Sequence, residues 1–130
     1  MHPNAVLIQK GFEAFAQGDL ATLSELFADD AVWVTESGGI LKGKFEGKEA
    51  IFGSWAPIGP ETNGTFKQEV EEIYADDRVC VAVTNLSGTR NGKSLDGARS
   101  VIVFVVRDGK VVQGRIISQD PDRADDFWAA

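Results

Sequence analysis

The spacing of hydrophobic residues changes along the chain, and the order of the change restricts the possible folds. Near the start, apolar side chains recur every three or four positions, as at Ile8, Phe12 and Phe15, which is typical of an amphipathic helix. Gly18 predicts the end of this helix, and Asp19 predicts the N-cap of a second one. The chain therefore opens with two helices joined by a tight turn.

The later sequence alternates between apolar and polar residues, which predicts strands. The expected strands are residues 31–36, 40–41, 65–74, 79–86, 100–106 and 111–118. A third helix is expected after Gly47 and before Pro57, and a short helix capped by Asp122 is expected in the tail. The pairs Asn91-Gly92 and Asp108-Gly109 predict hairpin turns. This order predicts an α+β domain with an antiparallel sheet.

The composition of the chain restricts the classes of molecule that it is expected to bind. The chain has 130 residues and a net charge of -7, with no linker or repeat, so we expect a single domain over residues 1–130. An acidic chain repels phosphate backbones and anionic lipid, so we expect neither nucleic acid nor membrane as a partner. The first residues do not resemble a signal peptide, and no apolar stretch reaches about 18 residues, so a cytoplasmic location is expected.

Two rare residue types limit the chemistry. Cys80 is the only cysteine and lies in an apolar run, which predicts a buried core residue. His2 is the only histidine, so Ser-His and Cys-His catalysis and histidine-based metal sites are not expected. No calcium-loop spacing or phosphate-binding loop is present either. We therefore expect neither a metal nor a cofactor.

Residues 101–106 are apolar at every position. A sheet with one face in water should alternate, so something must cover both faces of this strand. Helices can cover one face; the other needs the tail or a second subunit. We expect a homodimer.

Several segments resemble a known family. Residues 18–31 are similar to a passage that SnoaL-like and ketosteroid isomerase-like proteins carry between their first helices and first strand. Residues 41–51, 87–93 and 107–111 resemble that family's entry into its third helix and its two hairpin turns. The resemblance, to the nuclear transport factor 2-like superfamily, implies a cone-shaped curved antiparallel sheet. Three helices from the N-terminal half would enclose an apolar pocket for a small apolar molecule.

The resemblance can be tested at the catalytic positions of the steroid isomerases. The aspartate base falls on Thr35, and the tyrosine of the oxyanion hole falls on Gly11. The protonated aspartate falls near Val101 or Ile102. Because none of these residues has the required chemistry, we do not expect a ketosteroid isomerase of the usual mechanism.

Two other carboxylates are candidate acid/base groups. The SnoaL-like cyclases place an aspartate at the end of the last strand, a position that falls on Gln119, with Asp120 next to it. The alternative is that Asp120 is part of a turn and N-cap. Glu36 is the second candidate; its alternative is an exposed residue before a turn.

The last strand and two tryptophans are expected to line the pocket. Alternation places Val112, Gly114, Ile116 and Ser118 on one side of the last strand, and the resemblance makes that the pocket side. Small Gly114 is expected to leave room there.

We predict that Trp33 and Trp55 bind ligand together with Ile116 and Ser118; plain core packing of the tryptophans is the alternative. Tyr74 and Arg99 are weaker candidates.

Two functions from different classes follow. The first is a binding protein or enzyme for a small apolar molecule, with cofactor-independent isomerase, cyclase or hydrolase-like acid/base chemistry. The second is a non-catalytic module for homodimerisation or partner binding. The sequence does not name a substrate, because this superfamily hosts many activities.

Overall fold

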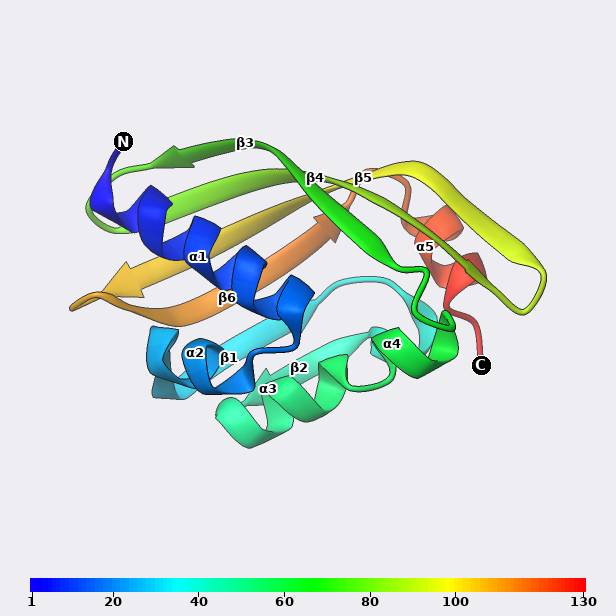
Figure 1. Cartoon of the computed structure of the whole chain (residues 1–130), viewed down its shortest axis with the longest axis horizontal. Coiled ribbons are helices and arrows are strands. Elements are labelled where there is room, and N and C mark those ends of the chain that lie inside the picture. Colours follow the sequence, from blue (N-terminus) through cyan, green and yellow to red (C-terminus); the bar gives the residue numbers. More distant parts are fainter.

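The computed structural model describes all 130 residues as five α-helices, one 3-10 helix and a six-stranded sheet (Figure 1). The helices are α1 (Pro3–Gln17), α2 (Leu20–Leu26), η1 (Gly39–Leu41), α3 (Lys48–Trp55), α4 (Ile58–Glu61) and α5 (Pro121–Phe127). The strands are β1 (Phe27–Thr35), β2 (Gly43–Glu46), β3 (Lys67–Ala75), β4 (Val79–Arg90), β5 (Lys93–Arg107) and β6 (Lys110–Ser118). No helix combines the length and hydrophobicity that crossing a bilayer requires.

The sheet has the strand order β2-β1-β6-β5-β4-β3. Four of its five pairings are antiparallel, and the α+β class is confirmed. The pairing of β1 with β6 is parallel, so the prediction of a wholly antiparallel sheet was wrong at this one position. Parallel neighbours need a long crossover, and here the whole chain from β2 to β5 provides it.

The predicted start of the fold is confirmed with small shifts. Asp19 is the N-cap of α2, and its carboxylate accepts hydrogen bonds from the backbone N–H and hydroxyl of Thr22. These two bonds lower the pKa of Asp19. Gly18 ends α1 in the left-handed conformation. Helix α1 begins at Pro3 because the ring of His2 caps it.

Two local predictions were wrong, and one short helix was not expected. The residues expected to form a strand at 40–41 form η1, and the strand that returns beside β1 is β2. Pro57 does end α3, but a further short helix, α4, follows. The tail helix α5 is capped by Asp120 rather than Asp122, because Pro121 occupies its first turn.

The core lies between the sheet and helices α1 to α3. It includes Ala31, Ile51, Cys80 and Ala82, all fully buried. The predicted burial of Cys80 is confirmed. Desolvation raises the pKa of its thiol to about 11, so the sulfur stays protonated and unreactive near neutral pH.

Strands β4 and β5 extend well beyond their predicted ends and form a long arm (Figure 1). At its tip, Asn91 and Gly92 both have positive φ, as the hairpin signal predicts. The arm reaches α5, and Leu95 packs there with Phe127 and Trp128 in a second, smaller core. The C-terminal helix is thereby held against the arm.

Candidate functional site

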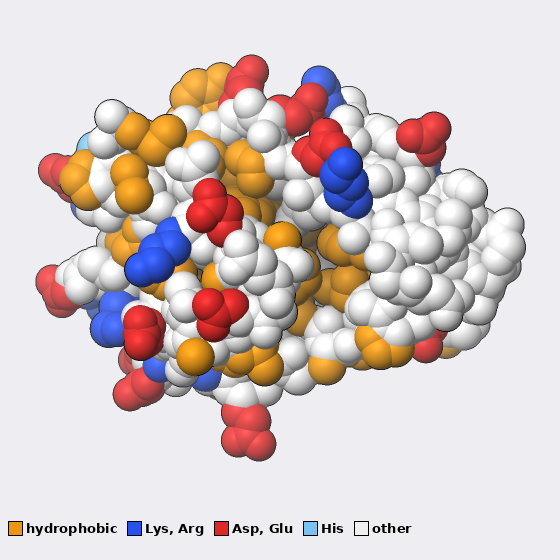
Figure 2. Space-filling model, in the orientation of Figure 1, with side chains coloured by type: hydrophobic (Ala, Val, Ile, Leu, Met, Phe, Trp, Pro, Cys, Tyr) orange, Lys and Arg blue, Asp and Glu red, His pale blue; other side chains and the backbone are white.

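A cavity of about 160 Å³ lies between the concave face of the sheet and the helices. Of its 30 lining residues, 21 are hydrophobic, so its wall is mainly apolar. One water molecule needs about 10–15 Å³ of such space, so the cavity has room for a small organic molecule. Figure 2 shows hydrophobic side chains at the bottom of a hollow near the middle of one face.

Aromatic rings from four elements form one side of this cavity. Trp33 on β1 and Trp55 on α3 meet edge to face, with ring centroids 4.9 Å apart. Phe15 on α1 also meets Trp55 edge to face, with ring centroids 5.6 Å apart, and the ring of Phe104 on β5 is tilted against that of Trp33, with centroids 5.9 Å apart. Edge-to-face contacts of this kind stabilise aromatic clusters, so the wall is preorganised.

The four residues predicted to bind ligand, Trp33, Trp55, Ile116 and Ser118, all lie on the cavity wall. Trp33 is 5% exposed, so most of its surface is core packing, whereas Trp55 is only partly buried. Ligand binding by these residues stays a prediction.

Gly114 does not leave free space, contrary to the expectation. A Cβ atom at this position would lie 2.3 Å from the ring of Trp33, because the tryptophan lies across the glycine. The glycine therefore makes room for Trp33 and not for a ligand.

We expect Gly114→Ala to lower the free energy of unfolding by about 1–3 kcal/mol, because the added methyl must displace Trp33 in a packed core. Gly53→Ala is a matched control, since its Cβ would meet no atom within 4 Å and alanine favours the helix. Urea unfolding measures both. Equal stability of the two variants would contradict this packing.

The predicted alternation along β6 fails at Val112. Val106 pairs with Val111, and Val105 pairs with Gln113, so Val112 is an extra residue in a bulge. Val111 consequently takes the inward position and lines the cavity in place of Val112. From Gly114 onward, the residues of β6 that point into the cavity are the ones that the alternation predicts.

The two candidate carboxylates lie in different places. Glu36 forms an ion pair with Arg115, and both side chains are about two-fifths exposed; neither lines the cavity. Asp120 does line the cavity, at the start of α5, where its carboxylate accepts a hydrogen bond from the backbone N–H of Arg123. The N-cap interpretation of Asp120 is thus confirmed, and the two carboxylates do not form a pair.

The positions transferred from the steroid isomerases fall on the cavity as the resemblance implies. Thr35, Gly11 and Ile102 all line it, whereas Val101 does not. The wall therefore has no carboxylate at the base position and no donor at either oxyanion position.

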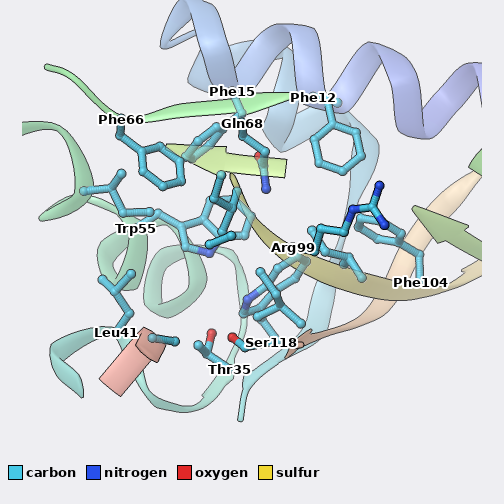
Figure 3. A pocket seen from close by; sticks show the side chains of 18 of the residues that line it. Phe12, Phe15, Thr35, Leu41, Trp55, Phe66, Gln68, Arg99, Phe104 and Ser118 are labelled. Atoms are coloured by element: carbon cyan, nitrogen blue, oxygen red, sulfur yellow. The ribbon is translucent and has the colours of Figure 1, made fainter. Parts of the chain in front are cut away.

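Five neutral polar side chains on the wall have no hydrogen-bond partner in the protein: Thr35, Ser37, Gln68, Ser118 and Gln119. In Figure 3 the hydroxyl groups of Thr35 and Ser118 lie close to each other on one side, and Gln68 lies across the cavity from them. The Oγ atom of Ser37 is fully buried, a state that normally costs about 1–3 kcal/mol without a partner. The other four groups can donate hydrogen bonds to a ligand or accept them from it.

Sequence reasoning missed Ser37 and Gln68. Gln68 pairs with Leu86, which pairs with Ala98, and all three line the cavity. The polar character of β3 gave no sign of which of its residues would point inward. Only the pairing of the strands decides this.

Arg99 also contributes to the wall, but strand alternation directs its side chain away from the interior. Its neighbour Ser100 is buried on the inner side, and the guanidinium of Arg99 binds both carboxylate oxygens of Glu71, at 3.0 and 3.2 Å. The other lining arginine, Arg123, donates to the carbonyl oxygen of Asp96. Tyr74 lies outside the cavity, where its hydroxyl binds Glu72.

Helix α5 and Trp128, which follows it directly, line one end of the cavity. The carboxylate of Asp125 accepts hydrogen bonds from the backbone N–H groups of Gly38 and Gly39, at 2.7 and 3.2 Å. These bonds lower the pKa of Asp125. Their contribution to stability is therefore complete above the ordinary value of 3.8 and is lost as the pH falls through the lower folded-state value.

Comparison with known proteins identifies the family. The sequence profile of the SnoaL-like domain matches residues 8–114. The uncharacterised protein Rv0034 of Mycobacterium tuberculosis is 31% identical over 124 residues, which cover 95% of this chain and 94% of that protein.

Solved structures agree with this assignment. Bal32a, from a soil-derived mobile gene cassette, is 35% identical, with a TM-score of 0.91 over 97% of this chain and 96% of its own. An NTF2-like protein from Burkholderia pseudomallei has a TM-score of 0.87 at 19% identity, with both chains covered completely. The profile and the relatives together show that the chain belongs to the SnoaL-like domain family and has the nuclear transport factor 2-like fold.

Proposed function

We propose that the protein binds a small, largely apolar ring compound in the cavity. The observation that carries this proposal is the open cavity, with its wall of edge-to-face aromatic rings and unpartnered polar groups. Cavities with an apolar wall and a few directed polar groups are typical ligand sites. The fold is shared with IdmH of Streptomyces antibioticus, to which polyketide cyclase activity is ascribed; IdmH is 24% identical, with a TM-score of 0.75 over 92% of this chain and 93% of its own.

Acid/base chemistry of the isomerase, cyclase or hydrolase kind would depend on Asp120, the only carboxylate on the wall. Its capping role does not prevent this, since a carboxylate has two oxygens and only Oδ1 accepts from Arg123. Asp120→Asn should leave ligand binding largely intact and should affect turnover only.

We expect Trp55→Ala to weaken the binding of naphthalene about tenfold or more, because a large buried aromatic contact is worth roughly 1.5–3 kcal/mol. Equilibrium dialysis measures the dissociation constant. Phe52→Ala is the matched control: Phe52 also lies on α3 and contacts Trp55 at 5.6 Å, but it does not line the cavity. Equal weakening by both variants, or no binding to the unaltered protein, would refute the proposal.

The second candidate function, a dimerisation module, rests on the convex face of the sheet. The partly exposed residues Val81, Val83, Val101 and Val103 form adjacent cross-strand pairs there, and Ile117 beside Val101 is 43% exposed. Soluble monomers rarely expose apolar patches of this kind over a large area. We propose that a second copy of the chain covers this face. A dimer formed through the convex face is compatible with ligand binding in the cavity on the concave face.

Sedimentation equilibrium at micromolar concentration should therefore give twice the chain mass of 14.0 kDa. Val103→Lys should give the mass of a monomer, because the charge would have to be desolvated in the interface. Val6→Lys, on the exposed surface of α1, is the control and should remain a dimer. A monomeric unaltered protein would exclude this function.

A further inference from the structure

We propose that the cavity selects an uncharged ring compound that carries a hydroxyl or carbonyl oxygen, which binds to the side chains of Thr35 and Ser118. We refer to these two residues as the hydroxyl cluster. This inference rests on the proposed binding function and specifies the class of ligand.

The hydroxyl cluster is built where β1 and β6 end side by side. Thr35 pairs with Ile116 in the parallel register, and the backbone N–H of Glu36 donates to the carbonyl of Ile116. Ser118 follows Ile116 by two residues and ends β6 at the same edge of the sheet. Side chains two positions apart on a strand share one face, so Thr35, Ile116 and Ser118 point to the cavity together.

No group of the protein satisfies these hydroxyls. Neither the Thr35 nor the Ser118 side chain makes a hydrogen bond within the protein, and both residues line the cavity. Figure 3 shows the oxygens of Thr35 and Ser118 directed to the same space, below the aromatic wall. A ligand hydroxyl in this space could accept one hydrogen bond and donate another, and a ligand carbonyl oxygen could accept from both side chains, because each protein hydroxyl can donate or accept.

The interior contains no free cation to compensate an anionic ligand. The guanidinium of Arg99 is held by Glu71, and that of Arg123 binds the carbonyl oxygen of Asp96. Asp120 adds a carboxylate at the end of the cavity, and the whole chain has a net charge of -7. A carboxylate on the ligand would lose its hydration without gaining a partner, so the cavity favours uncharged oxygen groups.

Across the cavity, the Gln68 amide supplies a second neutral polar group (Figure 3). Its amide can accept through oxygen and donate through nitrogen. The polar groups therefore stand at two sides of an aromatic middle. This distribution fits a flat ring system with oxygen atoms at its edges.

The test compares naphthalene, 2-naphthol and 2-naphthoate by equilibrium dialysis at pH 7. We expect the unaltered protein to bind 2-naphthol at least tenfold more tightly than 2-naphthoate. The double variant Thr35→Val/Ser118→Ala should bind 2-naphthol about tenfold more weakly, as expected for the loss of one or two hydrogen bonds, and should bind naphthalene within about twofold of the unaltered protein. Ser94→Ala removes an exposed hydroxyl on β5 and should change the binding of neither naphthalene nor 2-naphthol.

Three results would overturn the inference. Tighter binding of 2-naphthoate than of 2-naphthol would show that the cavity selects anions. Equal changes for naphthalene and 2-naphthol in the double variant would show that the hydroxyl cluster only shapes the wall. Failure of the unaltered protein to bind any of the three would refute the proposed function itself, together with this inference.

Discussion

We expect no measurable isomerisation of a 5-ene-3-ketosteroid by this protein. The residues at the three catalytic positions are present on the cavity wall, but Thr35 cannot act as a general base, and Gly11 and Ile102 cannot donate to an enolate oxygen. Loss of one oxyanion donor alone commonly lowers the rate roughly a hundred- to a thousandfold. An absorbance assay for the conjugated ketone product measures the rate.

The control for this assay is an authentic isomerase at equal concentration. A comparable rate from this protein would contradict the expectation and would require another base. Asp120→Asn and Glu36→Gln would then identify it, because Asp120 lines the cavity and Glu36 is paired with Arg115 outside it. Loss of activity only in Glu36→Gln would show that the placement of these carboxylates is wrong.

Replacing Arg90 by leucine is expected to lower the free energy of unfolding by about 3 kcal/mol. Arg90 is 5% exposed, and its guanidinium binds Glu61 at 2.8 Å and the carbonyl oxygens of Phe127 and Ala129 at 2.9 and 2.7 Å. Breaking a buried ion pair usually costs about 3–5 kcal/mol, and the partial exposure of Glu61 places this case at the lower end. The two carbonyls would also lose their donor.

Lys93→Met is the matched control, because Lys93 also donates to the tail, at the carbonyl of Asp126, but is 41% exposed. Its effect should stay within about 0.5 kcal/mol. Urea unfolding at one fixed protein concentration measures both variants, since association would otherwise shift the midpoint. Equal effects would show that Arg90 does not hold α5.

The local features of this fold were readable from the sequence. Asn91-Gly92 and Asp108-Gly109 were recognised as hairpins because both residues of each pair take positive φ, which few other residues tolerate. Asp19 was recognised as a cap because its interaction with Thr22 spans only three residues. The resemblance also placed Thr35 on the cavity.

The register of β6 could be determined only from the tertiary structure. The inward residue at its start is Val111 rather than Val112, because a bulge shifts the alternation, and no residue type marks that bulge. Gly114 was taken for open space until its contact with Trp33 was known. Alternation predicts which residues share a face, but pairing decides where the alternation breaks.

The contacts that close the cavity could not be predicted from the sequence, for a related reason. Asp125 binds Gly38 across 87 positions of the chain, and Arg90 binds Phe127 across 37. Neither contact was predicted, because local patterns carry no information about such distant partners. The sequence by itself determined the elements and most of the inward faces. The tertiary structure decided which polar groups meet, because hydrogen bonds between distant segments form only when the sheet and α5 bring them together.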